Sequence, residues 1–450
     1  MPGDVIASPG IPFCFRHPLH RHVPDAPDRA ISHRLAGLSR ALMAAEPLIL
    51  VAITPGLIFA SRLFWPLVGV LLLLAAARWH QTRRLARPAP TGLLMVVLVL
   101  LLPMTYAVSV TPDLTRASLG YLIAGIAFYQ WVINWTVSGT RLGWLLVIVL
   151  GVVSILAAVS PLLVQDGSGE GVRSFLPPVL RTLSQRLPEH VNANVMSGTL
   201  AIWLPLALAM AAYPCCIQVR HRPLMRGVAL ASSALILAAI LMLSARGVWM
   251  ALAVAACLAA AVYWPRLWRL TPLALALAWL GLAQGWYQSL AQALFSHDAL
   301  GGFAVRMDIW ARGLAALHDF ALTGMGIGSW GRLGPLLYPT ALIATGQDVP
   351  HVHNLLLQVG LDLGVVGLAT YGGLLALSFG LVQRARRRFL AAGARDLAAV
   401  ALAVWAGMVV MLVHGLLDAV SWSAKPAVLA WILLAVAVTL YLFSEEQARQ

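Results

Sequence analysis

The sequence is poor in charged residues and in cysteine. Only 11% of its 450 residues are Asp, Glu, Lys or Arg, against about 25% in soluble globular proteins. This shortage excludes a soluble enzyme, a disordered chain and a nucleic-acid-binding protein. The four cysteines are spaced neither as zinc ligands nor as a disulfide framework. They are Cys14, Cys215, Cys216 and Cys257.

Apolar residues make up 60% of the chain. They are gathered in blocks of about 20 residues, the length that an α-helix needs to cross a bilayer, and short polar seams separate the blocks. The sequence therefore predicts an all-α polytopic membrane protein with about 12 transmembrane helices. The expected spans are residues 46–61, 63–78, 92–110, 118–138, 143–163, 194–213, 227–243, 247–263, 271–288, 355–382, 397–418 and 426–443.

The basic residues, which give a formal net charge of +14, predict the orientation in the membrane. If the N-terminus is cytoplasmic and the spans alternate, about two thirds of the Lys and Arg residues fall inside, as the positive-inside rule requires. We therefore expect cytoplasmic tails over 1–45 and 444–450 and an integral membrane domain over 46–443. The long periplasmic loops would be 164–191 and 289–353, the second between spans nine and ten, so a site built on loops should face outward.

Arginine and tryptophan recur near the expected outer face. Arg246 lies in a short connection between two spans, where it is either an interfacial anchor or an anion site suited to phosphate. Arg306 and Trp310 are four residues apart on one face of an expected surface helix, with Arg306 either solvated or available to an anion. The Gly-rich stretch 324–331 lacks the strand and βαβ unit of a dinucleotide site. A flexible turn is expected there, beside a Trp330 that could stack on a sugar.

Two histidines and an aspartate mark the start of the tenth span. His351 and His353 alternate, and no third ligand is spaced to match them, so a metal site is not predicted. A neutral imidazole at the membrane surface is instead well suited to proton transfer. Asp362 lies at membrane depth, where an ionisable group is either functional or paired. It is expected to have a functional role or, equally, to be a structural partner of one outer arginine. Asp418, near the outer end of the next span, falls under the same rule.

These residues also form a longer pattern. His353 and Asn354 are followed by nine residues and then by Gly364-Val365-Val366-Gly367. This pattern resembles the signature of the O-antigen ligase and Wzy-type polymerase superfamily. Asp362 stands where that family usually has Glu. The family's Arg between two spans is matched by Arg246, its R…W segment by Arg306 and Trp310, and its Asn-x-Asn element by Asn192 and Asn194.

The resemblance implies transfer of a glycan from a polyprenyl diphosphate, such as undecaprenyl diphosphate, to an acceptor sugar hydroxyl. The transfer would occur at the periplasmic face of the bacterial inner membrane. Permanently cationic Arg246 and Arg306 suit the diphosphate, and His353 suits general-base catalysis, with His351 as the competing base. No metal and no cofactor are expected. Supporting or glycan-binding roles fall to His351, Asn354, Asp362, Trp310, Trp330, Asn192 and Asn194.

The favoured function is ligation of O-antigen to lipid A–core in lipopolysaccharide biosynthesis. A Wzy-type polymerase that extends O-antigen or exopolysaccharide on its carrier is the alternative, because it uses the same donor. A protein oligosaccharyltransferase is a weaker one. A secondary transporter is disfavoured because the sequence shows neither internal repeats nor a long central loop.

Overall fold

The computed structural model describes residues 26–59, 61–165, 177–186, 191–214, 221–243, 245–286, 289, 303–340, 342 and 349–449. Within these ranges the fold is helical, apart from a two-residue parallel pairing of β1 (Val164–Gln165) with β2 (Val191–Asn192). The cysteines 14, 215 and 216, most of the N-terminal tail and parts of each long loop (166–176, 187–190, 290–302, 341 and 343–348) lie outside the described residues. The helices are α1 (Ala26–Phe59), η1 (Ser61–Leu63), α2 (Phe64–Thr82), α3 (Gly92–Val108), α4 (Pro112–Trp135), α5 (Gly139–Leu163), α7 (Pro178–Gln185), α8 (Ala193–Ala201), α9 (Leu204–Ala212), α10 (Arg222–Leu243), α11 (Arg246–Tyr263), η3 (Pro265–Leu270), α12 (Thr271–Ala283), α14 (Phe303–Asp319), α15 (Trp330–Leu337), α16 (Leu355–Ala391), α17 (Arg395–Gly415) and α18 (Ala427–Arg449).

The all-helical class is confirmed, and eight stretches of the described chain are long and apolar enough to cross a membrane. They are α1, α5, α8 with α9, α10, α11, α16, α17 and α18. The other four predicted spans fall on α2, α3, α4 and α12, which are helical but shorter or less apolar. The chain is therefore a multi-pass membrane protein, and the number of twelve spans stays a prediction.

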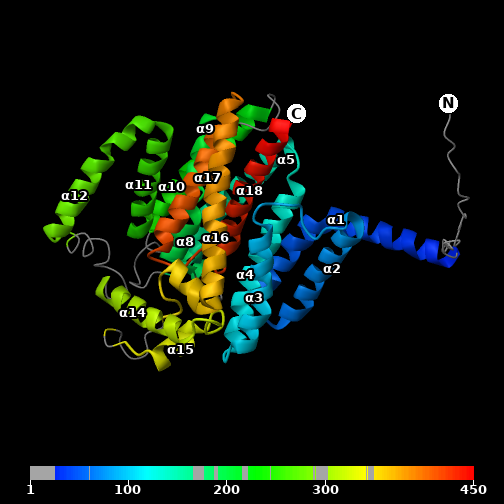
Figure 1. Cartoon of the computed structure of the whole chain (residues 1–450), viewed down its shortest axis with the longest axis horizontal. Coiled ribbons are helices and arrows are strands. Elements are labelled where there is room, and N and C mark those ends of the chain that lie inside the picture. Colours follow the sequence, from blue (N-terminus) through cyan, green and yellow to red (C-terminus); the bar gives the residue numbers. More distant parts are fainter. Residues whose placement is uncertain are drawn as a thin grey trace, which may run out of the picture.

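The two ends of the helix bundle differ in their residues. In Figure 1 the C-terminus lies at one end of the bundle, and α14 and α15 lie at the other. Arg87 pairs with Glu446 and Arg388 with Glu445 at the C-terminal end. The orientation of these two ends in the membrane stays a prediction.

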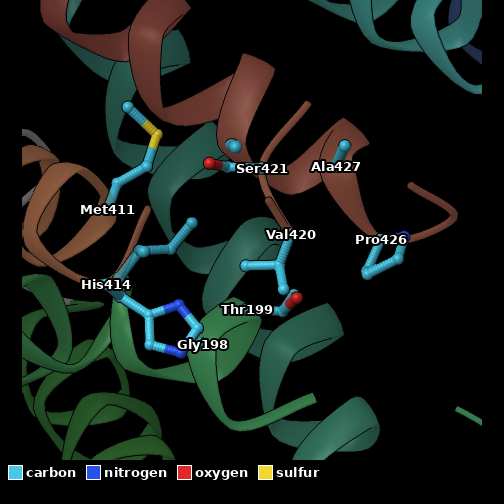
Figure 2. Close-up of a pocket in the computed structure, with 10 residues that line it drawn as sticks. Gly198, Thr199, Met411, His414, Val420, Ser421, Pro426 and Ala427 are labelled. Carbon is cyan, nitrogen blue, oxygen red and sulfur yellow. The ribbon is translucent and has the colours of Figure 1, made fainter. Parts of the chain in front are cut away.

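Small residues let the helices cross closely in the middle of the bundle. A Cβ on Gly198 of α8 would come within 2.5 Å of the His414 ring of α17, and one on Gly407 would come within 2.3 Å of the Ile202 carbonyl oxygen. Figure 2 shows the His414 ring beside Gly198 and Val420. The cavity left at this crossing is about 10 Å³, room for about one water molecule. In a bilayer, where apolar contact alone gives little preference for helix over lipid, such close packing stabilises the bundle.

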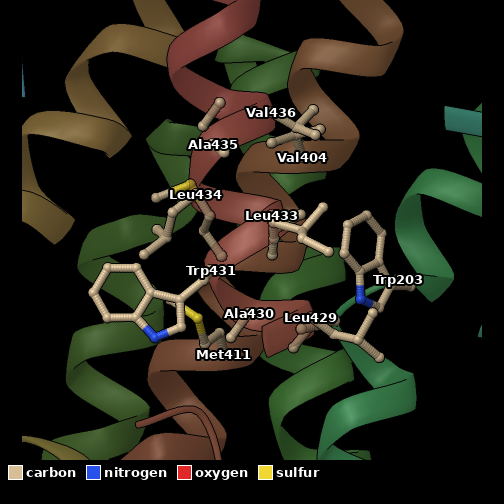
Figure 3. Close-up of a cluster of buried hydrophobic side chains, with 14 of the residues drawn as sticks. Trp203, Val404, Met411, Leu429, Ala430, Trp431, Leu433, Leu434, Ala435 and Val436 are labelled. Carbon is tan, nitrogen blue, oxygen red and sulfur yellow. The ribbon is translucent and has the colours of Figure 1, made fainter. Parts of the chain in front are cut away.

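The core of the bundle is formed around α18. Its membrane-length window is 89% buried, and it packs against α4, α16 and α17. Figure 3 shows Trp431, Leu433 and Val436 of this helix surrounded by side chains of neighbouring helices. Gly125 of α4 makes room for the Trp431 indole, since a Cβ there would lie 2.2 Å from the ring.

The helix α16 is interrupted at Gly364, where it contacts the segment that follows α14. Gly364 has φ 72° and ψ −173°, a backbone conformation outside the helical region. The break lets the Val365 N–H donate to the Ala321 carbonyl at 2.7 Å. A Cβ on Gly364 would lie 2.6 Å from the Leu322 carbonyl oxygen. Glycine is therefore required here both by the positive φ and by the close approach of another chain segment.

Candidate functional site

The candidate site lies at the end of the bundle that carries α14. Three segments meet there: α14 itself, the residues before α16, and the turn between α17 and α18. The turn supplies Asp418, which is 3% exposed. Sequence reasoning noted Asp418 only as a buried acid and gave it no role in the site.

Asp418 brings the two histidines together. Its Oδ1 lies 3.5 Å from Nε2 of His351 and 3.5 Å from Nδ1 of His353. The two imidazole rings are 4.2 Å apart between centroids and inclined at 59°. Burial raises the pKa of Asp418, but the neighbouring imidazoles of His351, His353 and His414 together lower it further, so its pKa lies below the usual range. The centre of the site is therefore a carboxylate held between imidazoles.

The two imidazoles differ in how their nitrogens are used. Nδ1 of His351 accepts a hydrogen bond from the His353 backbone N–H at 3.3 Å, so Nε2 of a neutral His351 carries the proton and faces Asp418. Burial, together with the charges of His353 and Arg306, lowers the pKa of His351 to about 4 against the opposing effect of Asp418. In contrast, neither ring nitrogen of His353 has a hydrogen-bond partner among the described residues. With Nδ1 directed at Asp418, Nε2 of His353 keeps a lone pair for a substrate.

The backbone around His353 is fixed by several contacts. His353 has φ 50°, in the left-handed region that few residues other than glycine adopt. Its carbonyl oxygen accepts a hydrogen bond from the Trp310 indole at 3.3 Å, and the preceding Val352 N–H donates to Gln358 at 3.0 Å. Such a conformation persists only when the surroundings hold it, and it is found most often at functional sites. Trp310, expected from the sequence to share a face with Arg306, thus helps to hold His353.

Asn354 begins α16 as its N-cap. Its Oδ1 accepts from the Leu357 N–H at 3.0 Å, and its Nδ2 donates to the Leu416 carbonyl at 3.2 Å. The side chain therefore caps a helix and ties it to the α17–α18 turn. The supporting role that these contacts give Asn354 is structural, and a role in binding the glycan stays a prediction.

Arg306 is inside the site rather than on its surface. The helix predicted around it is present as α14, but the side chain is only 4% exposed and donates to the Leu417 carbonyl. The solvated arginine considered at the sequence level is therefore wrong. The positive charge of Arg306 also lowers the pKa of His351.

Arg246 approaches the same turn from another helix. It is the first residue of α11, and a Cβ on the adjoining Gly247 would lie 3.4 Å from Leu417 and 3.8 Å from His414. Arg306 thus contacts this turn directly, whereas the residue next to Arg246 lies against it and the Arg246 side chain is exposed. The other predicted feature of this region, an Asn-x-Asn element, forms the start of α8, where Asn192 Oδ1 caps the helix by accepting from the Asn194 N–H at 2.8 Å.

Asp362 organises a second network next to the site. Its Oδ1 accepts from the Gly328 N–H at 3.1 Å and from Gln358 at 2.9 Å, and its Oδ2 accepts from the Trp422 indole at 2.9 Å. Its partners among the described residues are therefore not arginines, which corrects the pairing expected from the sequence. Asp362 joins α16, the Gly-rich turn and the α17–α18 turn, and it does not contact His353.

The Gly-rich turn is a packed structure. Gly324, Gly326 and Gly328 all have positive φ, and a Cβ on Gly328 would lie 2.2 Å from Ser118 Oγ of α4. Trp330 is 3% exposed and belongs to a small apolar cluster beneath α14. The flexible turn and the sugar-stacking role expected for Trp330 are therefore wrong, because neither face of the indole is open to a ligand.

A cavity of about 530 Å³ opens beside His351. Its walls come from α4, from the start of α15 and from the α17–α18 turn, and they include Ser118, Tyr121, Arg332, Gln358 and Ser423. This volume falls within the range of about 300–1,000 Å³ in which proteins bind small molecules.

A metal ion is the other species that the cluster could hold. The ligand atoms of His351, His353 and Asp418 all lie within 4.8 Å of one another. The sequence-based statement that no third ligand matches the two histidines is therefore wrong, because Asp418 comes from a distant segment. The residue types fit a divalent cation, but the buried charge of Arg306 nearby opposes one.

Sequence reasoning missed two residues of the site. Asp418 lies 65 positions from His353 and His414 lies within a span, and no local spacing connects either to the His351–His353 pair. The sequence did offer one signal for these two residues. Each is an ionisable group in or beside an apolar span, where such groups are usually functional or paired.

Comparison with known proteins addresses the segment that carries most of these residues. No curated protein matches the chain. Residues 231–372 match the Wzy_C family model, described as O-antigen ligase. The matched segment includes both arginines, both histidines, Asn354 and Asp362, whereas Asn192, His414 and Asp418 lie outside it. Residues 231–372 thus form a segment of the O-antigen ligase type, and the motif around His353 lies within it.

Proposed function

We propose that this protein transfers a glycan from a polyprenyl-diphosphate carrier to an acceptor sugar hydroxyl, with lipid A–core as the acceptor. The observation that carries the proposal is the uncommitted Nε2 of His353, on a ring paired with Asp418 and close to buried Arg306. A buried polar atom without a partner costs about 1–3 kcal/mol. A substrate hydroxyl at Nε2 would remove that cost.

In the proposed reaction, His353 and the two arginines each have one role. The acceptor oxygen attacks the anomeric carbon of the donor while its proton passes to Nε2 of His353. The bond between the anomeric carbon and the phosphate oxygen breaks, and its electron pair leaves with the carrier diphosphate. Arg306 and Arg246 stabilise the negative charge that develops on the diphosphate. The donor linkage is already activated, so the reaction requires no nucleotide.

Asp418 serves His353 as a positioning residue. When His353 takes the proton it becomes a cation beside a carboxylate 3.5 Å from its Nδ1. The carboxylate fixes the ring orientation and stabilises the imidazolium, as in other carboxylate–histidine pairs. His351 is less suited to be the base, since its Nδ1 lone pair is used by the His353 N–H and its Nε2 faces Asp418.

Transfer is proposed to proceed without a metal. The charge that a divalent ion would supply to the leaving diphosphate is available from two guanidinium groups, and Arg306 lies close enough to the cluster to weaken cation binding. The test is turnover of the purified protein in the presence of EDTA, with added Mg²⁺ or Zn²⁺ as the comparison. Loss of activity with EDTA and its recovery with one ion would assign that ion to His351, His353 and Asp418.

A deletion strain tests the function itself and separates it from polymerisation. Loss of O-antigen from lipopolysaccharide, with long carrier-linked polymer accumulating, is the expected result. Accumulation of single carrier-linked repeat units would identify a polymerase, and normal lipopolysaccharide with unglycosylated secreted proteins would identify a protein oligosaccharyltransferase. The proposed location is the inner membrane, with this site facing the periplasm.

A further inference from the structure

We infer that the cavity of about 530 Å³ beside His351 is the binding site for an uncharged sugar of the acceptor. This inference rests on the proposed glycan transfer and adds where the second substrate enters. It concerns a site separate from the two arginines proposed to hold the donor diphosphate.

The position of the cavity separates it from the donor side. Its wall includes His351 and, from the α17–α18 turn, Ala419 and Ser423. Arg306 instead reaches Leu417, earlier in the same turn, and Arg246 is not among the residues that line the cavity. The acceptor would therefore approach the histidine pair at His351, and the donor diphosphate would be held where Arg306 reaches Leu417. A transfer between two glycans requires two such separate positions.

The lining has the chemistry of a carbohydrate site. Among the described residues, the hydroxyls of Ser118 and Tyr121 make no hydrogen bond within the protein, so they are available to a ligand. Gln358 and Ser423 also line the cavity, and their side chains are held by hydrogen bonds to Asp362. Hydroxyl groups, which both donate and accept hydrogen bonds, match the hydroxyl groups of a sugar.

The one arginine of the lining is already neutralised. Arg332 pairs with Asp113 of α4 through two contacts of 3.2 and 3.1 Å, which is bidentate geometry. The pair joins α15 to α4 across one wall of the cavity. Because the charge of Arg332 is compensated by Asp113, the cavity favours an uncharged sugar unit over a phosphorylated one.

Filling the cavity tests the assignment. Ala117 of α4 lines it, whereas Ala127 of the same helix does not. For purified A117W, we expect the KM for lipid A–core, prepared from a strain without the protein, to rise at least about tenfold. The Kd for the undecaprenyl-diphosphate-linked glycan should stay within about twofold, and A127W should change neither constant. An unchanged acceptor KM in folded A117W, or a weakened donor Kd instead, would overturn the inference.

A labelling experiment gives a second readout that does not depend on turnover. In a background with the four natural cysteines replaced by serine, A117C is labelled with a maleimide. Core oligosaccharide freed from its lipid should slow the labelling, and undecaprenyl-diphosphate-linked glycan should not. Protection by the donor alone, or by neither compound, contradicts the assignment. If the wild type transfers nothing, the proposed function fails, but the labelling result still decides whether the cavity binds sugar.

Discussion

At the scale of single residues, the structure assigns different tasks to two histidines that look equivalent in the sequence. The family spacing favours His353 over His351, and the hydrogen bonds provide an independent reason. His351 uses Nδ1 as an acceptor, and His353 keeps both nitrogens without protein hydrogen bonds. We therefore expect His353→Ala to lower turnover by about 10²–10⁴-fold, the usual contribution of a general base.

The comparison that checks this prediction is His351→Gln, which preserves polarity and size at the neighbouring ring. Donor binding, measured separately from turnover at matched expression, should be retained in His353→Ala. An active His353→Ala protein beside an inactive His351→Gln protein would transfer the role of base to His351.

Asp418 allows a test that a purely structural residue would not pass. Asp418→Asn keeps the shape of the side chain but removes the charge that stabilises a cationic His353. Turnover should fall by about tenfold or more, while the Kd for the donor and the thermal unfolding midpoint change little. A parallel loss of donor affinity would place Asp418 in substrate binding instead.

The depressed pKa of His351 predicts a pH-dependent stability. In the unfolded chain His351 is protonated below its ordinary pKa of 6.5, whereas in the folded protein it is protonated only below about pH 4. Stability should therefore fall as the pH drops from 6.5 to about 4, by at most about 3 kcal/mol for this group. Unfolding midpoints in detergent at several pH values should show a smaller decline for His351→Gln than for the wild type. Equal declines would show that other groups cause the effect.

At the scale of elements, the break in α16 is the feature on which the site depends. Gly364→Ala places a Cβ 2.6 Å from the Leu322 carbonyl oxygen on a backbone with positive φ. We expect a destabilisation of more than about 2 kcal/mol and loss of activity. Gly372→Ala in the same helix is the control, since nothing lies within 4 Å of a Cβ there, and it should be neutral or stabilising. Similar unfolding midpoints for the two variants would contradict this account of the break.

The helices and the sequence motif could be predicted, but the burial of individual side chains could not. Apolar blocks and helical spacing are local, so α14, α16 and the segment around His353 follow from the sequence. Whether Arg306 or Trp330 faces solvent depends on which distant segment covers it, here the α17–α18 turn for Arg306. The role of Asp418 could not be predicted for the same reason, because Asp418 meets the histidines only when the α17–α18 turn packs against the start of α16.

At the scale of the whole molecule, topology is the prediction that remains to be tested. Leu336 of α15 is 73% exposed and lies at the end of the bundle that carries the site, whereas Ser329, in the same expected loop, is fully buried. In a cysteine-free background, Leu336→Cys should react with a membrane-impermeant maleimide added to the periplasm of intact cells. A cysteine in place of Arg387 should react only after lysis. The reverse pattern would invert the topology and rule out a periplasmic site.

The central place of α18 has a consequence for how the molecule is made. Translation delivers this helix after every helix that it contacts. Before α18 inserts, the surfaces of α4, α16 and α17 that it will cover face either lipid or the insertion machinery. Asp418 lies in the turn that leads into α18, so its final position beside the histidines forms only after α18 is in place. A ribosome stalled before Ala427 would leave a bundle that is inserted in the membrane but inactive.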